Sequence, residues 1–236
     1  MKIAFTILIL LLLYIFLSLG IFWYKSSHLP NLPVPDQSEK ILGSGPALKY
    51  IAAGDSTAAG VGASSLQTTY TYQVAQALAK NHTVDYKNIG VPGAKTADVL
   101  ASQISQIIAF KPDVVTISIG PNDATHLLPE SEILNNYKNI ISQLEAQTTA
   151  TIYITDIANF KSASLLPWFY IWLLDFRSGY INKQILALGN NRVKIIDIYS
   201  FGWSNYPDLS KTVTADHFHP NDLGYQNWTN AFLDKF

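Results

Sequence analysis

The stretch ALKYIAAGDS, residues 47–56, sets the fold of this 236-residue chain. Its first seven residues form an apolar run that is typical of a buried strand, and Gly54, Asp55 and Ser56 follow at its end. A serine at the end of such a strand lies at the carboxyl edge of a parallel sheet, where α/β folds place their ligands and reactive groups. Taken alone, Ser56 would equally suit the cap of a following helix.

Strand-like and helix-like segments alternate through the rest of the chain. The strands read as nearly continuous apolar runs, as expected for strands covered on both faces. We therefore predict an α/β fold, a three-layer α/β/α sandwich with a parallel sheet of five strands. The predicted strands are Leu48–Ala53, Thr83–Asn88, Val114–Ile119, Thr151–Ile157 and Val193–Ile198. The predicted helices are Thr69–Lys80, Thr96–Ala109, Glu130–Gln147, Ser178–Leu188 and Asn221–Phe236.

Near the carboxyl end, Asp216 and His219 are three residues apart and precede the last predicted helix. In a turn, this spacing brings the carboxylate to one ring nitrogen of the imidazole and leaves the other nitrogen free. A serine hydroxyl needs a neutral imidazole to accept its proton and a carboxylate to orient that imidazole. The pair is therefore a candidate partner of Ser56, although Asp-x-x-His alone is also typical of helix caps and surface ion pairs.

Two turns between these elements supply candidate donors to an oxyanion. Gly93 lies in the loop after the second predicted strand, where its backbone N–H can approach a substrate oxygen with no Cβ in the way. Asn122 follows the third predicted strand within Gly-Pro-Asn-Asp, and its side-chain amide can donate to the same oxygen. Because both turns follow strands of a parallel sheet, we expect them at the same edge as Ser56.

In this order, the blocks around Ser56, Gly93, Asn122 and His219 resemble the SGNH, or GDSL-type, serine hydrolases. The resemblance extends from Leu48 to about the end of the chain, and it implies a flavodoxin-like fold and ester hydrolysis. It also implies two sets of residues: a catalytic triad of Ser56, Asp216 and His219, and an oxyanion hole of Ser56, Gly93 and Asn122. One departure is His217, which stands where a glycine often follows the aspartate and predicts a narrower cleft beside the base.

Composition and charge exclude several other classes of protein. The chain carries 16 Lys and Arg against 17 Asp and Glu without a basic patch, which argues against a nucleic-acid partner. It has no cysteine, which excludes disulfides, thiol nucleophiles and cysteine-based zinc sites. His217 with Asp216 and His219 is reminiscent of a metal site, but a third ligand of convincing spacing is lacking. We expect no cofactor and no metal.

Residues 1–25 are predicted to be a transmembrane anchor. The run from Ile3 to Tyr24 is uncharged, lies between Lys2 and Lys25, and is long enough to cross a hydrocarbon core of about 30 Å as a helix. Its aromatic end suits the membrane–water interface. A cleaved signal peptide, leaving a secreted protein, is the alternative, but the run continues past the small residues at 18–20. Either interpretation places the domain outside the cytoplasm.

Residues 26–46 are predicted to be a linker, because they hold four prolines and scattered polar residues. The hydrolase domain then occupies residues 47–236. The charges that flank the apolar run lean weakly toward an amino terminus on the cytoplasmic side.

An apolar segment, LLPWFYIWLL at residues 165–174, follows the fourth predicted strand, where a short polar loop is expected. It is too short to span a membrane, and Pro167 permits a helix to begin there but not to pass through. Its rings have three alternative roles: packing on the core, lining an acyl pocket at the catalytic edge, or touching the bilayer near the anchor. For the second role, Trp168, Phe169 and Trp172 are the candidate pocket residues.

The leading hypothesis is a membrane-anchored serine esterase that acts through an acyl-enzyme on a lipid-like acyl ester or a lysophospholipid. The alternative substrate is an acetyl ester on a cell-wall or other polysaccharide. A non-catalytic surface-binding module on the same fold is a hypothesis of another class. That module would be expected to lack a triad or oxyanion residue, and all five are present. The sequence leaves the oligomeric state open.

Overall fold

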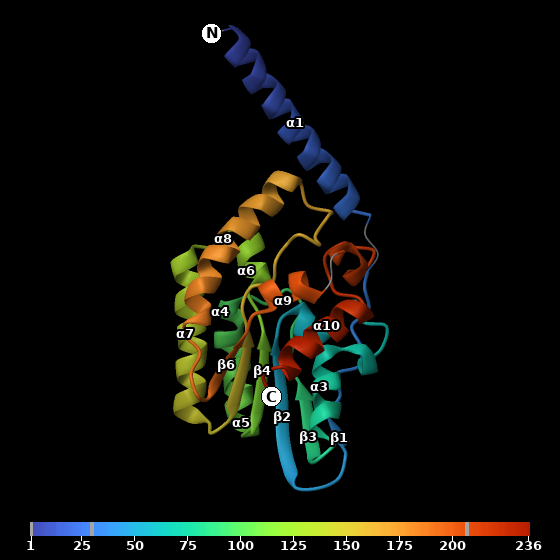
Figure 1. Cartoon of the computed structure of the whole chain (residues 1–236), viewed down its shortest axis with the longest axis vertical. Coiled ribbons are helices and arrows are strands. Elements are labelled where there is room, and N and C mark those ends of the chain that lie inside the picture. Colours follow the sequence, from blue (N-terminus) through green and yellow to red (C-terminus); the bar gives the residue numbers. More distant parts are fainter. Residues whose placement is uncertain (1, 29–30, 206–207) are drawn as a thin grey trace.

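The computed structural model describes residues 2–28, 31–205 and 208–236, and a six-stranded sheet lies at its centre (Figure 1). The strand order is β1-β3-β2-β4-β5-β6. The strands from β2 to β6 are parallel, and β1 pairs antiparallel with β3. Without β1, this is the flavodoxin-like order, in which the first two strands exchange places. The strands are β1 Lys40–Leu42, β2 Ala47–Gly54, β3 Thr83–Asn88, β4 Val114–Ser118, β5 Thr151–Thr155 and β6 Val193–Ile196.

The predicted count of five strands is wrong by one. The sixth strand, β1, lies inside residues 26–46, which the prolines led us to predict as a linker outside the fold. Three residues are too few to show a strand period, and β1 is stabilised by pairing along the edge of β3 that would otherwise be free. Just before it, Gln37 Nε2 donates to the carbonyl of Ala59 at 3.1 Å. Residues 29 and 30 of the predicted linker lie outside the described residues.

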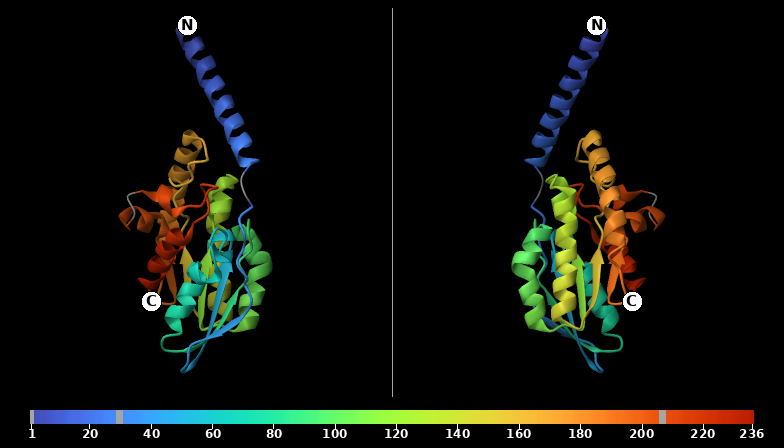
Figure 2. Two further views of the ribbon diagram at one scale, coloured as in Figure 1. Left: turned by 90° about the vertical axis from the view of Figure 1, so that its right-hand side faces the viewer. Right: turned by 90° about the vertical axis from the view of Figure 1, so that its left-hand side faces the viewer.

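Helices cover both faces of the sheet (Figure 2), which confirms the predicted three-layer arrangement. On one face lie α5, α7 and α8, and on the other α3, α9 and α10. The α-helices are α1 Lys2–Ser26, α2 Ser56–Ala59, α3 Tyr70–Leu78, α4 Thr96–Asp98, α5 Ile104–Phe110, α6 Pro121–Thr125, α7 Glu130–Gln147, α8 Trp168–Leu186, α9 Ile198–Asn205 and α10 Asp222–Leu233. Short 3-10 turns occupy Leu66–Thr68 and Leu209–Thr212, and a π-helical turn, Val99–Gln103, joins α4 to α5.

Each face of the sheet has its own apolar core, and β2 contributes to both. Ile51 and Ala53 pack into the core under α5, α7 and α8, whereas Tyr50 and Ala52 pack into the core under α3 and α10. Successive side chains of a strand point to opposite faces, so a strand covered on both sides is apolar at every position. This arrangement explains the continuous apolar run that leads to Ser56.

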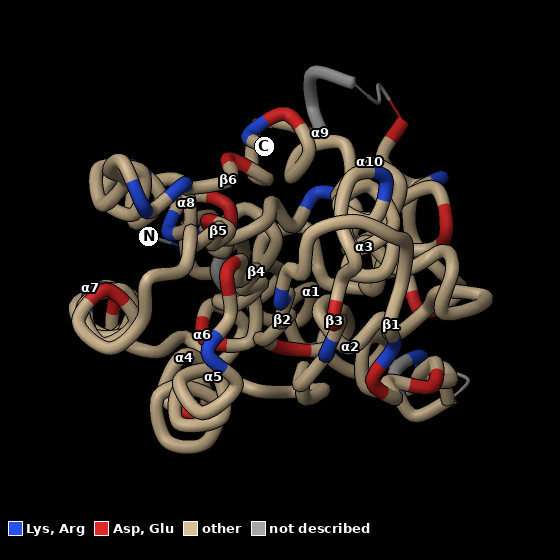
Figure 3. Tube along the Cα trace, turned by 90° about the horizontal axis from the view of Figure 1, so that it is seen from below, with Lys and Arg blue, Asp and Glu red and all other residues tan. Residues whose placement is uncertain are grey.

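Helix α8 begins ten residues earlier than the sequence predicts, at Trp168 instead of Ser178. Pro167 directly precedes it, and most of the apolar segment is therefore helical. Helix α1 projects from the end of the domain toward which the parallel strands run, and the start of α8 lies beside it (Figures 1 and 2). By length and composition, residues 2–25 of α1 are apolar enough to cross a membrane. Charges of both signs are interspersed around the domain (Figure 3).

Candidate active site

Ser56 is positioned by the backbone of the residues before it. Gly54 has a φ of +126°, and a Cβ there would lie 1.9 Å from the carbonyl oxygen of Ser118 in β4. Only glycine fits this position without displacing the neighbouring strand. Asp55 then caps α2, with its Oδ1 accepting a hydrogen bond from the backbone N–H of Thr57 at 2.9 Å. Ser56 is the first residue of that helix and is 7% exposed.

A glutamine that the sequence analysis did not single out holds the same turn in place. The Oε1 of Gln103 accepts a hydrogen bond from the Gly54 N–H at 2.7 Å, and its Nε2 donates to the Gly54 carbonyl at 2.9 Å. Gln103 is buried and lies in the π-helical turn, an element that is rare and frequent at functional sites. A single glutamine in a helical segment belongs to no recognisable motif, so pattern reasoning missed it.

Asp216 and His219 are brought together by a tight turn. The Oδ2 of Asp216 lies 2.6 Å from Nδ1 of His219. The other oxygen, Oδ1, accepts hydrogen bonds from Thr214 Oγ1 at 2.6 Å and from the backbone N–H groups of Phe218 and His219 at 2.9 and 3.0 Å. Four donors therefore fix the carboxylate, and the carboxylate in turn fixes the imidazole.

The free nitrogen of that imidazole faces the serine. The Nε2 of His219 lies 3.0 Å from Oγ of Ser56. This distance is within hydrogen-bond reach of a nucleophile and its base. The carboxylate, imidazole and hydroxyl thus form a continuous chain of hydrogen bonds from Asp216 to Ser56, the arrangement that activates a serine for acyl transfer.

Two carboxyl groups of the site have pKa values shifted in opposite directions. Burial opposes the charge of Asp216, but hydrogen bonds from His219, Thr214 and two backbone N–H groups outweigh it and hold the pKa of Asp216 well below its ordinary value. At Asp55 burial dominates over the hydrogen bond from Thr57 and raises the pKa of the carboxyl to about 7. Asp216 is therefore the carboxylate that stays charged beside the imidazole, whereas Asp55 caps a helix.

The two loops that carry Gly93 and Asn122 are joined to each other. The Nδ2 of Asn122 donates to the carbonyl of Ala94 at 3.0 Å, which leaves its second amide hydrogen free to bond elsewhere. Gly93 has a φ of +81°, and a Cβ there would meet open space. Its backbone is therefore exposed at the surface of this loop.

Further hydrogen bonds attach these loops to each other and to α2, the helix that begins with Ser56. Asp123, fully buried, accepts hydrogen bonds from the Thr96 N–H and, at 2.6 Å, from the Thr96 hydroxyl, and so ties α6 to α4. Asn88 donates to the carbonyl of Ala58 at 2.8 Å and so ties the end of β3 to α2. The segments of Ser56, Gly93 and Asn122 are thus one connected unit.

A cavity of about 90 Å³ opens beside His219. Its walls come from the residue after Ser56, the residue before Asn122, the loop after β5 and the segment around His219 and α10. They include Thr57, Pro121, Ala158, Phe160, Phe218 and Trp228. A cavity that binds benzene measures about 150 Å³, so this one suits a small group.

The candidate pocket residues Trp168, Phe169 and Trp172 do not line this cavity. Trp168 and Trp172 lie on the outer face of α8, 64% and 63% exposed, and Phe169 is half-buried. The indole Nε1 of Trp168 donates to the hydroxyl of Tyr14 in α1 at 2.7 Å. Trp168 therefore contacts the apolar helix, and all three rings lie away from the cavity. The sequence does not distinguish the two locations, because α8 is apolar on both faces.

His217 lies outside the cavity too, so the narrower cleft predicted from it is not seen. Its φ is +56°, in the left-handed region that favours glycine, and its Nδ1 lies 3.0 Å from the hydroxyl of Ser164. The ring faces an outer groove shared with Lys25 and His28. Within residues 2–28, 31–205 and 208–236, no group of three or more His, Asp or Glu side chains is arranged to hold a metal ion.

Comparison with known proteins gives a family match over most of the domain. Residues 52–226, well over half of the chain, match the model of the GDSL-like Lipase/Acylhydrolase family. No curated protein matches the sequence.

Three solved structures share the fold. A member of the lipolytic protein G-D-S-L family from Veillonella parvula is 19% identical with a TM-score of 0.64, over 80% of this chain and 97% of that chain. A lipase/acylhydrolase from Enterococcus faecalis is 19% identical with a TM-score of 0.58, over 80% and 94%. An acetylxylan esterase from Geobacillus stearothermophilus is 20% identical with a TM-score of 0.60, over 82% and 95%. At these identities the likeness shows the fold alone.

Proposed function

Because the chain belongs to the GDSL-like lipase/acylhydrolase family and is an ester-hydrolysing enzyme, we propose that it is a membrane-anchored serine esterase. The proposed triad is Ser56, His219 and Asp216. The observation that carries this proposal is the pair of short distances on the two sides of His219, 3.0 Å from Nε2 to the serine hydroxyl and 2.6 Å from Nδ1 to the carboxylate.

In the proposed reaction, Oγ of Ser56 attacks the carbonyl carbon of the ester while its proton passes to Nε2 of His219. Asp216 accepts the Nδ1–H, which orients the ring and stabilises the imidazolium. His219 then returns the proton to the departing alcohol as the acyl-enzyme forms. A water molecule, deprotonated by the same imidazole, attacks the acyl-enzyme. The bond from the acyl carbon to Oγ breaks, the imidazolium returns its proton to Oγ of Ser56, and the carboxylic acid is freed.

The negative charge that develops on the carbonyl oxygen needs donors placed before the reaction begins. We assign this role to the backbone N–H groups of Ser56 and Gly93 and to the side-chain amide of Asn122. The hydrogen bonds from Asn122 to Ala94 and from Thr96 to Asp123 support this assignment, because they fix the two loops relative to each other.

We assign residues 1–25 to a membrane anchor and residues 47–236, together with strand β1, to the hydrolase domain. The length and uncharged composition of α1 support the anchor. We place the domain outside the cytoplasm, because the charges that flank α1 lean toward a cytoplasmic amino terminus. The edge of the sheet that carries Ser56 lies on the side from which α1 projects (Figure 1).

For the acyl part of the substrate, the cavity favours a short group such as acetyl. Its volume of about 90 Å³ is well below the roughly 300–1,000 Å³ of pockets that enclose larger ligands. The similar acetylxylan esterase agrees with an acetyl ester on a saccharide. A lipid-like acyl ester, favoured by the sequence, remains the second candidate because the catalytic edge faces α1. Its acyl chain would have to extend beyond the cavity.

The test of the catalytic assignment is covalent labelling with a fluorophosphonate probe. We expect the probe to modify Ser56 of the full-length protein and to leave the Ser56→Ala variant unlabelled and without esterase activity. Ser162→Ala is the matched control, since Ser162 lines the same cavity and its loss should leave labelling intact. Labelling of Ser162 instead, or full activity of Ser56→Ala, would reject the proposed nucleophile.

A further inference from the structure

We propose that the amino-terminal half of α8 is a second membrane contact, which inserts into the leaflet beside α1. Four large rings, called here the aromatic stripe, are spaced four residues apart on this helix: Trp168, Trp172, Phe176 and Tyr180. Phe176 and Tyr180 are 67% and 58% exposed, similar to the two tryptophans. The proposal rests on the proposed anchoring by α1 but is independent of the catalytic assignment.

The stripe is not the face by which α8 packs on the domain. Residues three and four apart lie on one side of a helix, and the buried residues of α8 form a different row from the stripe. That row is Leu174, Ser178, Ile181, Asn182 and Ile185. Monomeric proteins rarely expose a continuous apolar patch of this kind, and such patches mark interaction sites.

The contact between Trp168 and Tyr14 identifies what covers the stripe. Tyr14 lies ten residues before Tyr24, the aromatic end of α1, which is about 15 Å along the helix axis at 1.5 Å per residue. If α1 spans a bilayer with Tyr24 at the interface, the start of α8 is already below the lipid surface. The indole N–H of Trp168 donates to the Tyr14 hydroxyl at 2.7 Å. This polar group therefore already has a hydrogen-bond partner, which it would need inside the apolar layer of a membrane.

The charges of the region agree with this placement. Residues 165–174 carry no charge, and the first charged side chains of α8 turn toward the domain. Asp175 Oδ1 accepts a hydrogen bond from the Phe160 N–H at 2.9 Å, and Arg177 donates to the Leu128 carbonyl at 2.6 Å. Lys161, which pairs with Asp175 at 4.0 Å, lines the same groove as Trp168, Trp172 and Phe176, so one charged group borders the stripe. Interfacial helices of this type keep their charged side chains at the headgroups while their apolar face is buried.

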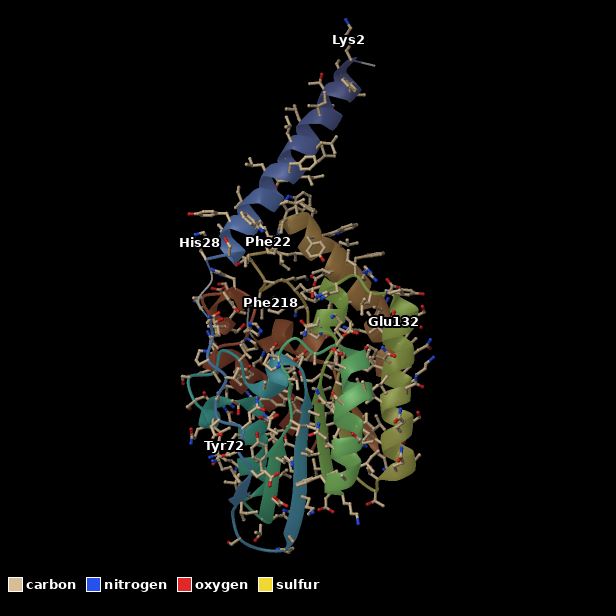
Figure 4. All side chains as sticks on the ribbon, turned by 180° about the vertical axis from the view of Figure 1, so that it is seen from behind. Lys2, Phe22, His28, Tyr72, Glu132 and Phe218 are labelled. Atoms are coloured by element: carbon tan, nitrogen blue, oxygen red, sulfur yellow. The ribbon has the colours of Figure 1, made fainter. Side chains whose placement is uncertain are left out.

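Such a contact orients the catalytic edge. The loop after β5 lines the cavity through Ala158, Phe160 and Ala163, and it continues directly into α8. Phe218, the neighbour of the base His219, lies at the end of the domain from which α1 projects (Figure 4). Two contacts, α1 and the stripe, hold that end toward the membrane, whereas α1 alone leaves the domain free to tilt.

The absence of cysteine from the chain permits a direct test by single-cysteine labelling. The full-length protein is prepared as Trp172→Cys, Phe176→Cys, Tyr180→Cys and Lys138→Cys, labelled with a nitroxide, and reconstituted in phosphatidylcholine–phosphatidylglycerol vesicles. The ratio of oxygen to nickel-chelate accessibility reports depth in lipid. We expect it to be several-fold higher at 172 and 176 than at the exposed control position Lys138 on α7, with 180 between them.

A fifth variant, Leu12→Cys in α1, separates this proposal from the anchor. If the nitroxide at position 12 lies in lipid and those at 172 and 176 lie in water, the membrane contact of α8 alone is overturned. If the nitroxides at all three positions lie in water, the anchor is overturned as well. Positions 172 and 176 that are shielded from both reagents would indicate a protein partner or a second copy, and would also overturn the proposal. All five labelled sites are exposed, and a melting temperature equal to that of the unmodified protein checks each fold.

Discussion

The hydroxyl of Tyr225 donates to the carbonyl of Val61 at 2.7 Å, which joins the last helix to the loop behind the nucleophile. Nearby, both oxygens of Asp222 accept hydrogen bonds from Ser64, at 2.8 and 2.6 Å. Ser56 and His219 are 163 positions apart in the chain, and bonds of this kind hold them within reach of each other. The position of His219 relative to Ser56 thus depends on the attachment of α10.

Tyr225→Phe removes the hydroxyl and leaves a buried carbonyl without its donor. We expect a loss of about 1–3 kcal/mol in the free energy of unfolding, together with a several-fold fall in kcat as His219 becomes less well placed. Tyr50→Phe is the matched control, because it removes a buried hydroxyl whose partner is Thr116, within the sheet. Urea denaturation and steady-state kinetics are the measurements. Equal kcat values for both variants would show that the Val61 bond is purely structural.

Asp216→Asn tests the orienter of the imidazole. An amide of the same shape presents a donor to His219 Nδ1 and selects the wrong tautomer, which lowers kcat roughly ten-thousandfold in a triad of this type. The folded state should persist, as judged by the melting temperature. Thr214→Val, which removes only one donor to the same carboxylate, should have a much smaller effect. A fall of less than tenfold in Asp216→Asn would assign the aspartate to the turn and not to catalysis.

Asn122→Ala tests the oxyanion hole. Loss of one such donor costs about 3 kcal/mol of transition-state stabilisation, so we expect kcat to fall roughly a hundredfold or more. The bond to Ala94 is lost as well, at about 1 kcal/mol of stability. Asn136→Ala removes an amide that bonds Thr96 in the same region and should cost similar stability with kcat retained. If Asn122→Ala loses stability but keeps its rate per folded molecule, Asn122 is structural.

Asp55→Asn should change how stability depends on pH. Because burial raises the pKa of Asp55 to about 7, folding favours its protonated form. Below about pH 4 the carboxyl is protonated in both states, and this contribution is fully present. As the pH rises to 7, Asp55 loses its proton first in the unfolded chain. The free energy of unfolding of the wild type therefore falls by at most about 4 kcal/mol relative to that of the variant.

Asparagine keeps the cap of α2 and does not titrate, so it isolates this effect. Urea denaturation of both proteins at several pH values between 4 and 8 measures the difference. His219 and Asp123 also influence the charge of Asp55, so the comparison is repeated with His219→Gln in both chains. If the difference in free energy of unfolding between the two proteins is the same at every pH in this range, Asp55 is charged in the folded protein throughout the range.

Ala158→Val tests whether the cavity beside His219 receives the acyl group. The added methyl groups narrow the cavity by about the size of the groups that distinguish butyrate from acetate. One methylene in an apolar pocket is worth about 1–3 kcal/mol, so the ratio of kcat/KM for p-nitrophenyl butyrate to that for the acetate should fall at least tenfold. Trp172→Ser, outside the cavity, should leave the ratio unchanged. If this ratio falls in Trp172→Ser and not in Ala158→Val, the aromatic segment and not the cavity binds the acyl group.

The parallel sheet and its layers could be predicted because each strand is buried on both faces and therefore apolar throughout. The five predicted strands all form, within a few residues of the expected bounds. Strand β1 could not be predicted, since three residues show no period and their stability comes from the distant edge of β3. For the same reason Gln103 was missed, because its role depends on Gly54, which lies 49 positions away.

The order of the motifs led to the proposed site residues, and in the structure His219 lies within hydrogen-bond distance of both Ser56 and Asp216. The location of the aromatic segment could not be predicted. Pro167 marks the start of α8, yet sequence alone does not say which side of an apolar helix faces the protein. That choice depends on the packing of Leu174 and Ile181 against the core. The rings of Trp168 and Trp172 then face outward, and only the three-dimensional structure separates them from the cavity.

The attachment of residues 37–42 to the body of the domain limits where the enzyme can work. Gln37 is bonded to Ala59 and Lys40 begins the pairing with β3, so the free part of the connection to α1 is short. The ten residues between the end of α1 at Ser26 and Gln37 span about 35 Å when fully extended. If α1 is the membrane anchor proposed above, an esterase held on so short a connection reaches only molecules in a thin layer above the bilayer. Its encounters are then governed by lateral diffusion along the surface, and its rate by the density of substrate per membrane area.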